Sequence, residues 1–215
     1  DWLAELDWTV TPHSSRLQIF ADLIRTGTFA IGRIWHTPAS MSFLRQNEYS
    51  DGLVHSVLGI EGTHVLRTRA EQIALNPGEL HLQSLDEPLT ISAQQPVSRL
   101  FFVARWSSLY GPGGVIELPR GGLVGGQSAF REVFTSAAHA ALNSVTSVDG
   151  PAFDGVRTGL EHLFASMLAN DVAGSPSSSG TAEFSGRSKR ARESQSASLL
   201  RRASKLIEQR AGDVT

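Results

Sequence analysis

The sequence predicts an α+β chain in which an antiparallel β-barrel or sandwich is followed by an α-helical hairpin. Two observations lead to this fold class. From residue 28 to about residue 106, short runs of Val, Ile, Leu and Phe alternate with turn residues, which is typical of many short antiparallel strands. From residue 128 onward, apolar residues instead recur at steps of three and four, as on one face of a helix.

Eight segments carry the strand pattern, separated by turn-forming residues such as those at 76–78. The segments are 28–36, 41–46, 53–60, 64–69, 71–75, 80–85, 89–92 and 99–105. Successive residues of a strand point to opposite faces of a sheet. One face of the first segment is small and apolar apart from a single histidine, and we expect it to point inward. That face carries Ala30, Gly32, Ile34 and His36.

A glycine- and proline-rich stretch at 107–126 is predicted to be a connection between the barrel and two amphipathic helices. Ser128 is a suitable cap for the first helix, and Pro151 suits the first position of the second. The apolar faces of such a hairpin could cover the barrel, meet a second copy of the chain, or do both. We expect dimerisation through these faces. The residues concerned are Phe130, Phe134, Leu142, Leu160 and Phe164.

The end of the chain differs in composition from the rest. Residues 173–193 are rich in Gly and Ser and are predicted to be a flexible linker. From residue 185 the chain carries a net charge of +5, whereas the preceding part carries −7. Residues 194–215 predict a basic helix whose short apolar stripe, including Leu199 and Leu206, needs a packing partner. We therefore expect that the chain is cut off where a further domain begins.

Composition excludes several classes of protein. The chain has 215 residues, of which 40% are hydrophobic, and this is enough for one sizeable core. It has no cysteine, so disulfides, thiol catalysis and thiolate metal sites are excluded, and a cytoplasmic location is expected. No apolar run approaches the ~20 residues that a membrane span requires, so no membrane association is predicted.

The strand region contains His36, His55, His64 and His81, which raises the question of a metal site. A metal-binding barrel of this kind needs a His-x-His pair followed by a carboxylate and a third histidine, and the sequence lacks that pair. No Gly-x-Ser-x-Gly motif is present either. We therefore predict no metal, no cofactor and no catalytic residue.

Four segments resemble the AraC/XylS family of bacterial transcription regulators. Residues 35–45 (WHTPASMSFLR), 75–80 (LNPGEL) and 99–109 (RLFFVARWSSL) resemble the cupin-like sensor region of that family. Residues 199–213 (LLRRASKLIEQRAGD) resemble the opening helix of its DNA-binding domain. The order of barrel, helix pair, polar linker and basic helix also fits. The resemblance covers most of the chain.

The resemblance implies four regions. They are a cupin-like (jelly-roll-like) effector-sensing barrel at 1–110, a dimerising helical hairpin at 111–172, a linker at 173–193, and at 194–215 the first helix of a truncated helix-turn-helix domain. It also implies a homodimer in the cytoplasm that contacts DNA only through the domain that follows. The effector would be a small molecule that controls DNA binding.

A barrel interior lined by aromatic side chains and a few polar groups is a common small-molecule site. The effector is expected to be small, and aromatic or carboxylated, with Arg45 as the candidate contact for an anion because a guanidinium grips a carboxylate with two parallel bonds. The full set of candidate ligand-binding residues is Trp35, His36, Phe43, Arg45, His55 and Trp106. Two other interpretations stay open: a cupin-fold isomerase or dioxygenase with a metal in the barrel, and an interaction module whose filled barrel binds no ligand.

Overall fold

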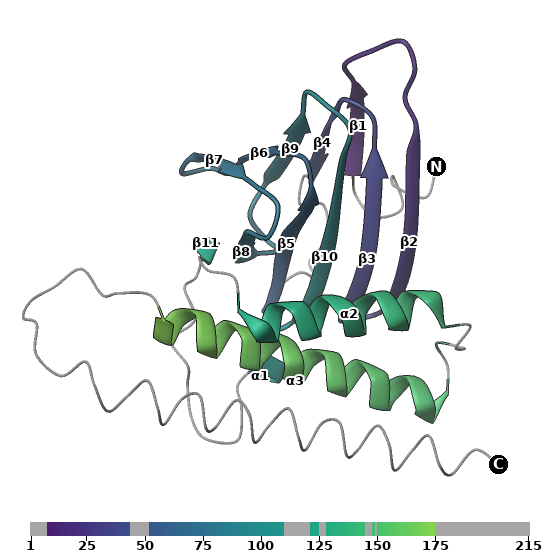
Figure 1. Cartoon of the computed structure of the whole chain (residues 1–215), viewed down its shortest axis with the longest axis vertical. Helices are drawn as coiled ribbons and strands as arrows, with labels where there is room; N and C mark the ends of the chain where they lie inside the picture. The colour runs from purple at the N-terminus through teal and green to yellow at the C-terminus, as the bar shows by residue number, and fades with distance from the viewer. Residues whose placement is uncertain are drawn as a thin grey trace, which may run out of the picture. The chain divides into compact units, whose positions relative to one another are not determined.

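The computed structural model describes residues 8–43, 52–109, 121–124, 128–144, 148 and 150–174. This part of the chain consists of two antiparallel sheets and three helices (Figure 1). The five-stranded sheet consists, in order, of β1 (Trp8–Pro12), β4 (Ala39–Phe43), β9 (Leu89–Ala93), β6 (His64–Arg67) and β7 (Gln72–Leu75). The six-stranded sheet consists, in order, of β11 (Gly121–Val124), β8 (Leu80–Ser84), β5 (Leu53–Glu61), β10 (Val97–Arg105), β3 (Phe29–His36) and β2 (Ile19–Thr26). The helices are α1 (Trp106–Leu109), α2 (Ala129–Asn143) and α3 (Pro151–Gly174).

The chain repeatedly crosses from one sheet to the other, as in a jelly-roll sandwich. It passes from β3 to β4 through the turn that contains Pro38, and from β5 to β6 through Gly62. Gly62 has a φ of +70°, and a Cβ there would lie 2.8 Å from the carbonyl oxygen of Pro96. Both constraints favour glycine. These crossings confirm the predicted fold class of an antiparallel sandwich followed by helices.

The eight predicted strand segments correspond, in order, to β3 through β10. The sequence interpretation missed β1, β2 and β11. β1 and β2 are edge strands whose side chains are all exposed or only half-buried, so the apolar pattern that marks a strand is weak in them. β11 and α1 lie within or next to the glycine-rich stretch 107–126, which was predicted to be a connection throughout.

Both helices of the hairpin form where the apolar stripes predict them. The hydroxyl oxygen of Ser128 accepts a hydrogen bond from the backbone N–H of Arg131, which caps α2 as expected. α3 begins at Pro151 and runs to Gly174, two residues into the predicted linker. The rest of that linker and the basic segment 194–215 lie outside the described residues.

The helices cover the outer face of the six-stranded sheet across one end of its strands (Figure 1). An aromatic cluster forms the centre of this core. Phe102 of β10 lies with its ring centroid 5.5 Å from that of Phe134 on α2 and 4.6 Å from that of Phe164 on α3. On its own sheet it contacts Phe29, at 5.4 Å. The hairpin is therefore part of the same hydrophobic core as the sheet.

This packing corrects part of the predicted dimer surface. Phe134, Leu160 and Phe164 are at most 3% exposed and contact the sheet or each other, so their side chains leave no surface for a second copy. Phe130 and Leu142 are only partly buried against the same core. The sequence pattern identified the apolar face of the helices, but it could not distinguish packing on the chain's own sheet from packing on a partner.

We predict that Phe102→Ala lowers the free energy of unfolding by about 3–5 kcal/mol, because it opens a cavity among the three remaining aromatic rings, which cannot collapse into it. The control is Phe20→Ala on β2, where the ring is 66% exposed and its removal should cost less than about 1 kcal/mol. Urea denaturation of both variants measures the difference. Equal losses would contradict the central position given to Phe102.

Candidate ligand site between the sheets

The inner face of the six-stranded sheet carries the candidate site. In the register of the sheet, Arg99 on β10 pairs with Ile34 on β3, and Val97 pairs with His36. The guanidinium of Arg99 reaches His36 and also Met41 of the opposite sheet, so these side chains lie between the two sheets. The predicted inward face of β3, with His36 as its polar member, is confirmed.

Six polar side chains from five strands are buried between the sheets, each at most 4% exposed. They are His36, His55, His64, His81, Gln83 and Arg99. Among the described residues, no aspartate or glutamate is buried. The interior is therefore polar and basic, without an acidic counterpart in the part of the chain that the structure describes.

Arg99 is oriented by a short chain of hydrogen bonds. Its Nη1 donates to Nε2 of His36 over 2.7 Å, and Nδ1 of His36 donates to the carbonyl of Thr37 over 2.7 Å. This pair of bonds requires the neutral Nδ1–H tautomer of His36. Burial, together with the charge of Arg99, lowers the pKa of His36 to about 4, so it is neutral at pH 7. His36 thus holds the guanidinium without neutralising its charge.

The other three histidines are neutral at pH 7 as well. Burial is the main cause in each case, and it lowers the pKa of His55 to about 3, of His64 to about 3 and of His81 to about 4. Burial also lowers the pKa of Arg99, to about 10, which leaves the guanidinium protonated at neutral pH. The polar interior therefore carries one positive charge, on Arg99.

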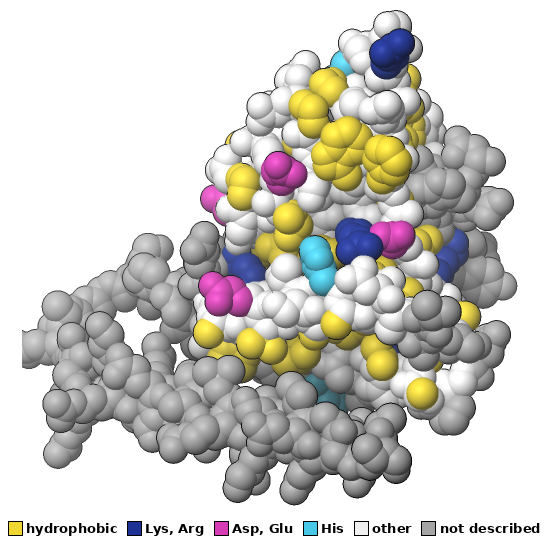
Figure 2. Space-filling view, turned by 45° about the vertical axis from the view of Figure 1, so that its right-hand side comes forward, with side chains coloured by type: hydrophobic (Ala, Val, Ile, Leu, Met, Phe, Trp, Pro, Cys, Tyr) yellow, Lys and Arg dark blue, Asp and Glu magenta, His cyan; other side chains and the backbone are white. Residues whose placement is uncertain are grey.

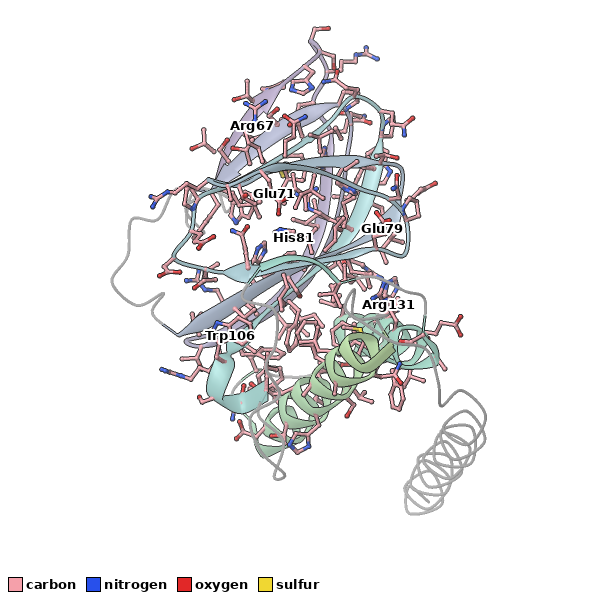
Figure 3. The ribbon with its side chains drawn as sticks, turned by 90° about the vertical axis from the view of Figure 1, so that its left-hand side faces the viewer. Arg67, Glu71, Glu79, His81, Trp106 and Arg131 are labelled. Carbon is pink, nitrogen blue, oxygen red and sulfur yellow. The ribbon has the colours of Figure 1, made fainter. Side chains whose placement is uncertain are left out.

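Several buried polar atoms between the sheets have no hydrogen-bond partner among the protein atoms. They are both ring nitrogens of His64, Nδ1 of His81 and Oε1 of Gln83. Figure 3 shows His81 directed into the space between the two sheets. Buried polar groups in folded proteins are nearly always hydrogen-bonded, to protein or to a bound molecule. In the described part of the chain, these atoms therefore lack the hydrogen bonds that buried polar groups normally make.

An apolar cluster borders the polar group within the same interior. It consists of Phe43, Val57, Leu66, Ile73, Leu75, Leu89 and Ile91. The ring of Trp8 lies against Phe43, at 5.5 Å between centroids, and against His55, at 6.1 Å. The interior thus combines a cationic polar region with an aromatic and aliphatic one, as small-molecule sites commonly do.

The structure brings three of the six predicted ligand-binding residues into this interior: His36, Phe43 and His55. Arg45 lies outside the described residues. The remaining two, Trp35 and Trp106, lie outside this interior, on the helix side of the six-stranded sheet.

Trp35 lies on the outer face of β3. Its ring contacts that of Phe20, at 5.6 Å between centroids, and lines a shallow pocket of about 130 Å³ together with Asp22 and Arg33. Trp106, at the start of α1, packs against the core between sheet and helices. Alternation assigns residues to two faces, and the size of a tryptophan does not say which of those faces is internal.

The sequence interpretation missed Arg99 and did not include His64, His81 or Gln83 among the ligand-binding residues. A signal for Arg99 was present, since it directly precedes the continuous apolar run 100–104 and lies on the opposite face from Leu100, Phe102 and Ala104. A charged residue within such a strand indicates either an edge or a buried polar site. Its place in the middle of the sheet, between β5 and β3, became evident only from the topology.

Nothing in the described part of the chain forms a metal centre. No group of three or more His, Asp or Glu side chains there could hold a metal ion. In α3, His162 is exposed and Glu161 is half-buried, and adjacent helical residues do not face each other. None of the described helices is long and apolar enough to span a membrane.

We predict that stability falls as the pH is lowered from about 6.5 toward 4. The pKa of each buried histidine is lower in the folded protein than the value near 6.5 in the unfolded chain, so the unfolded chain takes up protons first. Between pH 7.5 and 6.0 each imidazole should cost on the order of 1 kcal/mol of unfolding free energy. Urea denaturation at the two pH values measures this loss.

His81→Gln removes one buried imidazole. The loss of unfolding free energy between pH 7.5 and 6.0 should therefore be smaller than in the wild type by the contribution of one histidine, on the order of 1 kcal/mol. The matched control is His162→Gln on the exposed surface of α3, which should leave the pH dependence unchanged. The assignment of the buried histidines as neutral would be wrong if both variants kept the wild-type slope.

Comparison with known proteins finds solved structures of similar fold. No protein-family model matches the chain, and no curated protein sequence matches it at a significant level. Among solved structures, the AraC-like transcriptional activator CuxR matches with a TM-score of 0.56 and 12% identity, over 100% of this chain and 75% of that protein. The cupin domain of an XRE-family transcriptional regulator from Enterobacter cloacae matches over 40% of this chain, with a TM-score of 0.35 and 16% identity.

An enzyme also occurs among the partial matches: ectoine synthase from P. lautus, with a TM-score of 0.31 and 16% identity over 39% of this chain and 69% of the enzyme. The match to CuxR extends over the whole chain, and at this identity it establishes the fold. The chain thus shares its overall fold with that protein, an antiparallel two-sheet sandwich followed by helices.

Proposed function

We propose that this chain is the ligand-sensing and dimerisation region of a bacterial AraC-type transcription regulator that works in the cytoplasm. In this proposal a small effector binds between the two sheets without being transformed, and it controls DNA binding by a further domain. The observation that carries the proposal is the agreement in fold with an AraC-like activator over the whole chain. The buried polar group with unmade hydrogen bonds supports the position of the effector site.

The arrangement of the sheet offers a physical route from effector to helices. Strand β10 presents Arg99 to the interior and Phe102 to the helices. One face of this strand therefore lines the proposed site, and the other face packs against the helices. An effector that binds one arrangement of these strands more tightly shifts the population toward it. The helices, which pack on the same strands, then shift with them.

A second contact joins the rim of the site to α2. Arg131 of α2 is buried and donates hydrogen bonds from Nη1 to the carbonyl of Gly78 and from Nη2 to that of Val124. Gly78 lies in the turn between β7 and β8, three residues before His81, and its N–H donates to the carbonyl of Gly59 on β5. A movement of this turn on effector binding would be transmitted directly to the first turn of α2.

We predict that a small-molecule effector stabilises the chain, which a thermal-shift screen of small polar and aromatic compounds at neutral pH would detect. A compound at 100 times its Kd adds about 2.7 kcal/mol to the free energy of unfolding. His81→Leu should weaken binding of such a compound, because it removes a polar group directed into the site, whereas His162→Leu on the exposed surface of α3 should not. If no compound binds and the purified chain carries no small molecule, the effector role is wrong.

We also propose that two copies of the chain associate through the remaining surface of the helical hairpin. Phe130 and Leu142 of α2 and Leu163 of α3 are only partly buried against the chain's own core. Figure 2 shows apolar side chains gathered at the helical end of the described surface. A dimer would set the spacing of two DNA half-sites.

Light scattering at micromolar concentration should therefore give twice the mass of one chain. Leu163→Glu should shift the chain to the monomer, because a charge on the shared surface is costly to bury. The control, Glu161→Lys, changes a half-buried charged residue of the same helix and should leave the dimer intact. A wild-type chain that is monomeric at this concentration would rule out the dimer.

A further inference from the structure

The charge of Arg99 has no acidic partner in the described part of the chain. The side chain is 2% exposed and lies on β10, between two other strands. The ion pairs formed there join Arg33 to Asp22 and Arg157 to Asp154, and neither involves Arg99. The contacts of its guanidinium are a neutral imidazole and the sulfur of Met41. The imidazole accepts a short hydrogen bond and the thioether is a weak acceptor, but neither group carries the negative charge that would compensate the guanidinium.

Such a charge is costly in a ligand-free protein. A buried ion is tolerated when it is paired and hydrogen-bonded, and it otherwise loses hydration that nothing replaces. The buried histidines of the same interior cannot supply negative charge, because an imidazole is either neutral or positive. An acceptor with negative charge would therefore gain strongly from binding here, and a guanidinium offers it two parallel donors.

The interior that contains Arg99 also offers hydrogen-bond donors for those oxygen lone pairs of an oxyanion that do not bind Arg99. A neutral histidine carries one N–H donor, and both His64 and His81 have ring nitrogens without a partner. These two residues come from opposite sheets, so they can approach a bound group from two sides. The apolar cluster around Phe43 and Leu89 lies in the same interior and would accept the carbon skeleton of such a molecule.

We propose that the site between the sheets takes a small organic anion whose oxyanionic head group, a carboxylate or a phosphate, binds Arg99, while its apolar part packs against the cluster around Phe43. This inference rests on the proposed effector role and names the chemical class of the effector. It transfers the anion contact, expected from the sequence at Arg45, to Arg99. His36 acts as the residue that positions the guanidinium.

The test measures thermal stability and binding for three probes that share a phenyl ring: benzoate, its neutral isostere benzamide, and phenyl phosphate. The buffer contains neither carboxylate nor phosphate. We expect benzoate or phenyl phosphate to raise the Tm of the wild-type chain by several degrees at millimolar concentration, and benzamide to leave it unchanged. Comparison of the two anions distinguishes a carboxylate effector from a phosphorylated one.

The key variant is Arg99→Met, which replaces the cation by an apolar side chain of similar length. We expect its Tm without ligand to be equal to or higher than that of the wild type, because a costly unpaired charge has been removed. We expect its affinity for the anion to fall by at least about tenfold. The matched control, Arg105→Met, changes an exposed arginine of the same strand and should alter neither quantity.

Arg99→Lys provides a second, independent measurement, since it keeps the charge but loses the two parallel donors. It should keep part of the stabilisation by the anion and bind more weakly than the wild type. The proposal is overturned if Arg99→Met fails to fold or loses many degrees of Tm without ligand, because Arg99 would then be satisfied by the protein itself. Equal binding of benzoate by the wild type and both Arg99 variants would also overturn it.

The outcomes separate this inference from the proposed function on which it rests. If a neutral compound binds between the sheets and Arg99→Met binds it as well as the wild type does, the effector role stands and the anionic class falls. If no compound of any charge binds and no small molecule accompanies the purified chain, both fall.

Discussion

The two-residue alternation of strand β10 is the constraint on which the rest of the structure depends. The strand lies in the middle of the six-stranded sheet, and both of its faces are buried. One face carries Leu100, Phe102 and Ala104 toward the helices, and the other carries Val97 and Arg99 toward the second sheet. Because alternate side chains are fixed to opposite faces, a shift of register by one residue would turn Arg99 toward the helices and Phe102 toward the second sheet.

The two faces of this sheet differ in packing and hydrogen bonding: the helix side is filled by aromatic rings, whereas the inner side has polar groups without partners. On the helix side, the rings of Phe102, Phe134 and Phe164 fill the space between sheet and helices, with centroids 4.6–5.5 Å apart. On the inner side, Arg99 lacks an acidic partner among the described residues, and nitrogens of His64 and His81 lack hydrogen bonds. The helix-side core therefore supplies stability, while the inner face retains binding capacity that folding has not used.

In the proposed sensor, coupling between the two faces would need no separate relay, because strand β10 itself carries both Arg99 and Phe102. Arg131 adds a second point of attachment, because it joins α2 to the turn at Gly78 through a charge-assisted hydrogen bond. The helices are thus held both by the outer face of the sheet and by the rim of the interior. This double attachment suits a sensor whose output is the position of its helices.

The sequence by itself determined the order and type of most elements. Apolar alternation and turn residues located β3 through β10, and the change to a helical period after Ser128 located α2 and α3. These signals are local, since they depend on which neighbours along the chain share a face. The same alternation placed His36 on the inward face of β3. It failed for β1 and β2, because edge strands bury too little to carry the pattern.

Only the tertiary structure decided which side chains meet. Trp35 and His36 are neighbours in sequence, yet one lines the outer surface and the other holds a buried guanidinium. Arg99 became the centre of the site because β10 lies between β5 and β3 and faces Met41 of the other sheet, a relation between segments 58 residues apart. Phe134 and Phe164 face the chain's own sheet for the same kind of reason. Periodicity gives each element its faces, and only the packing of distant elements determines what each face contacts.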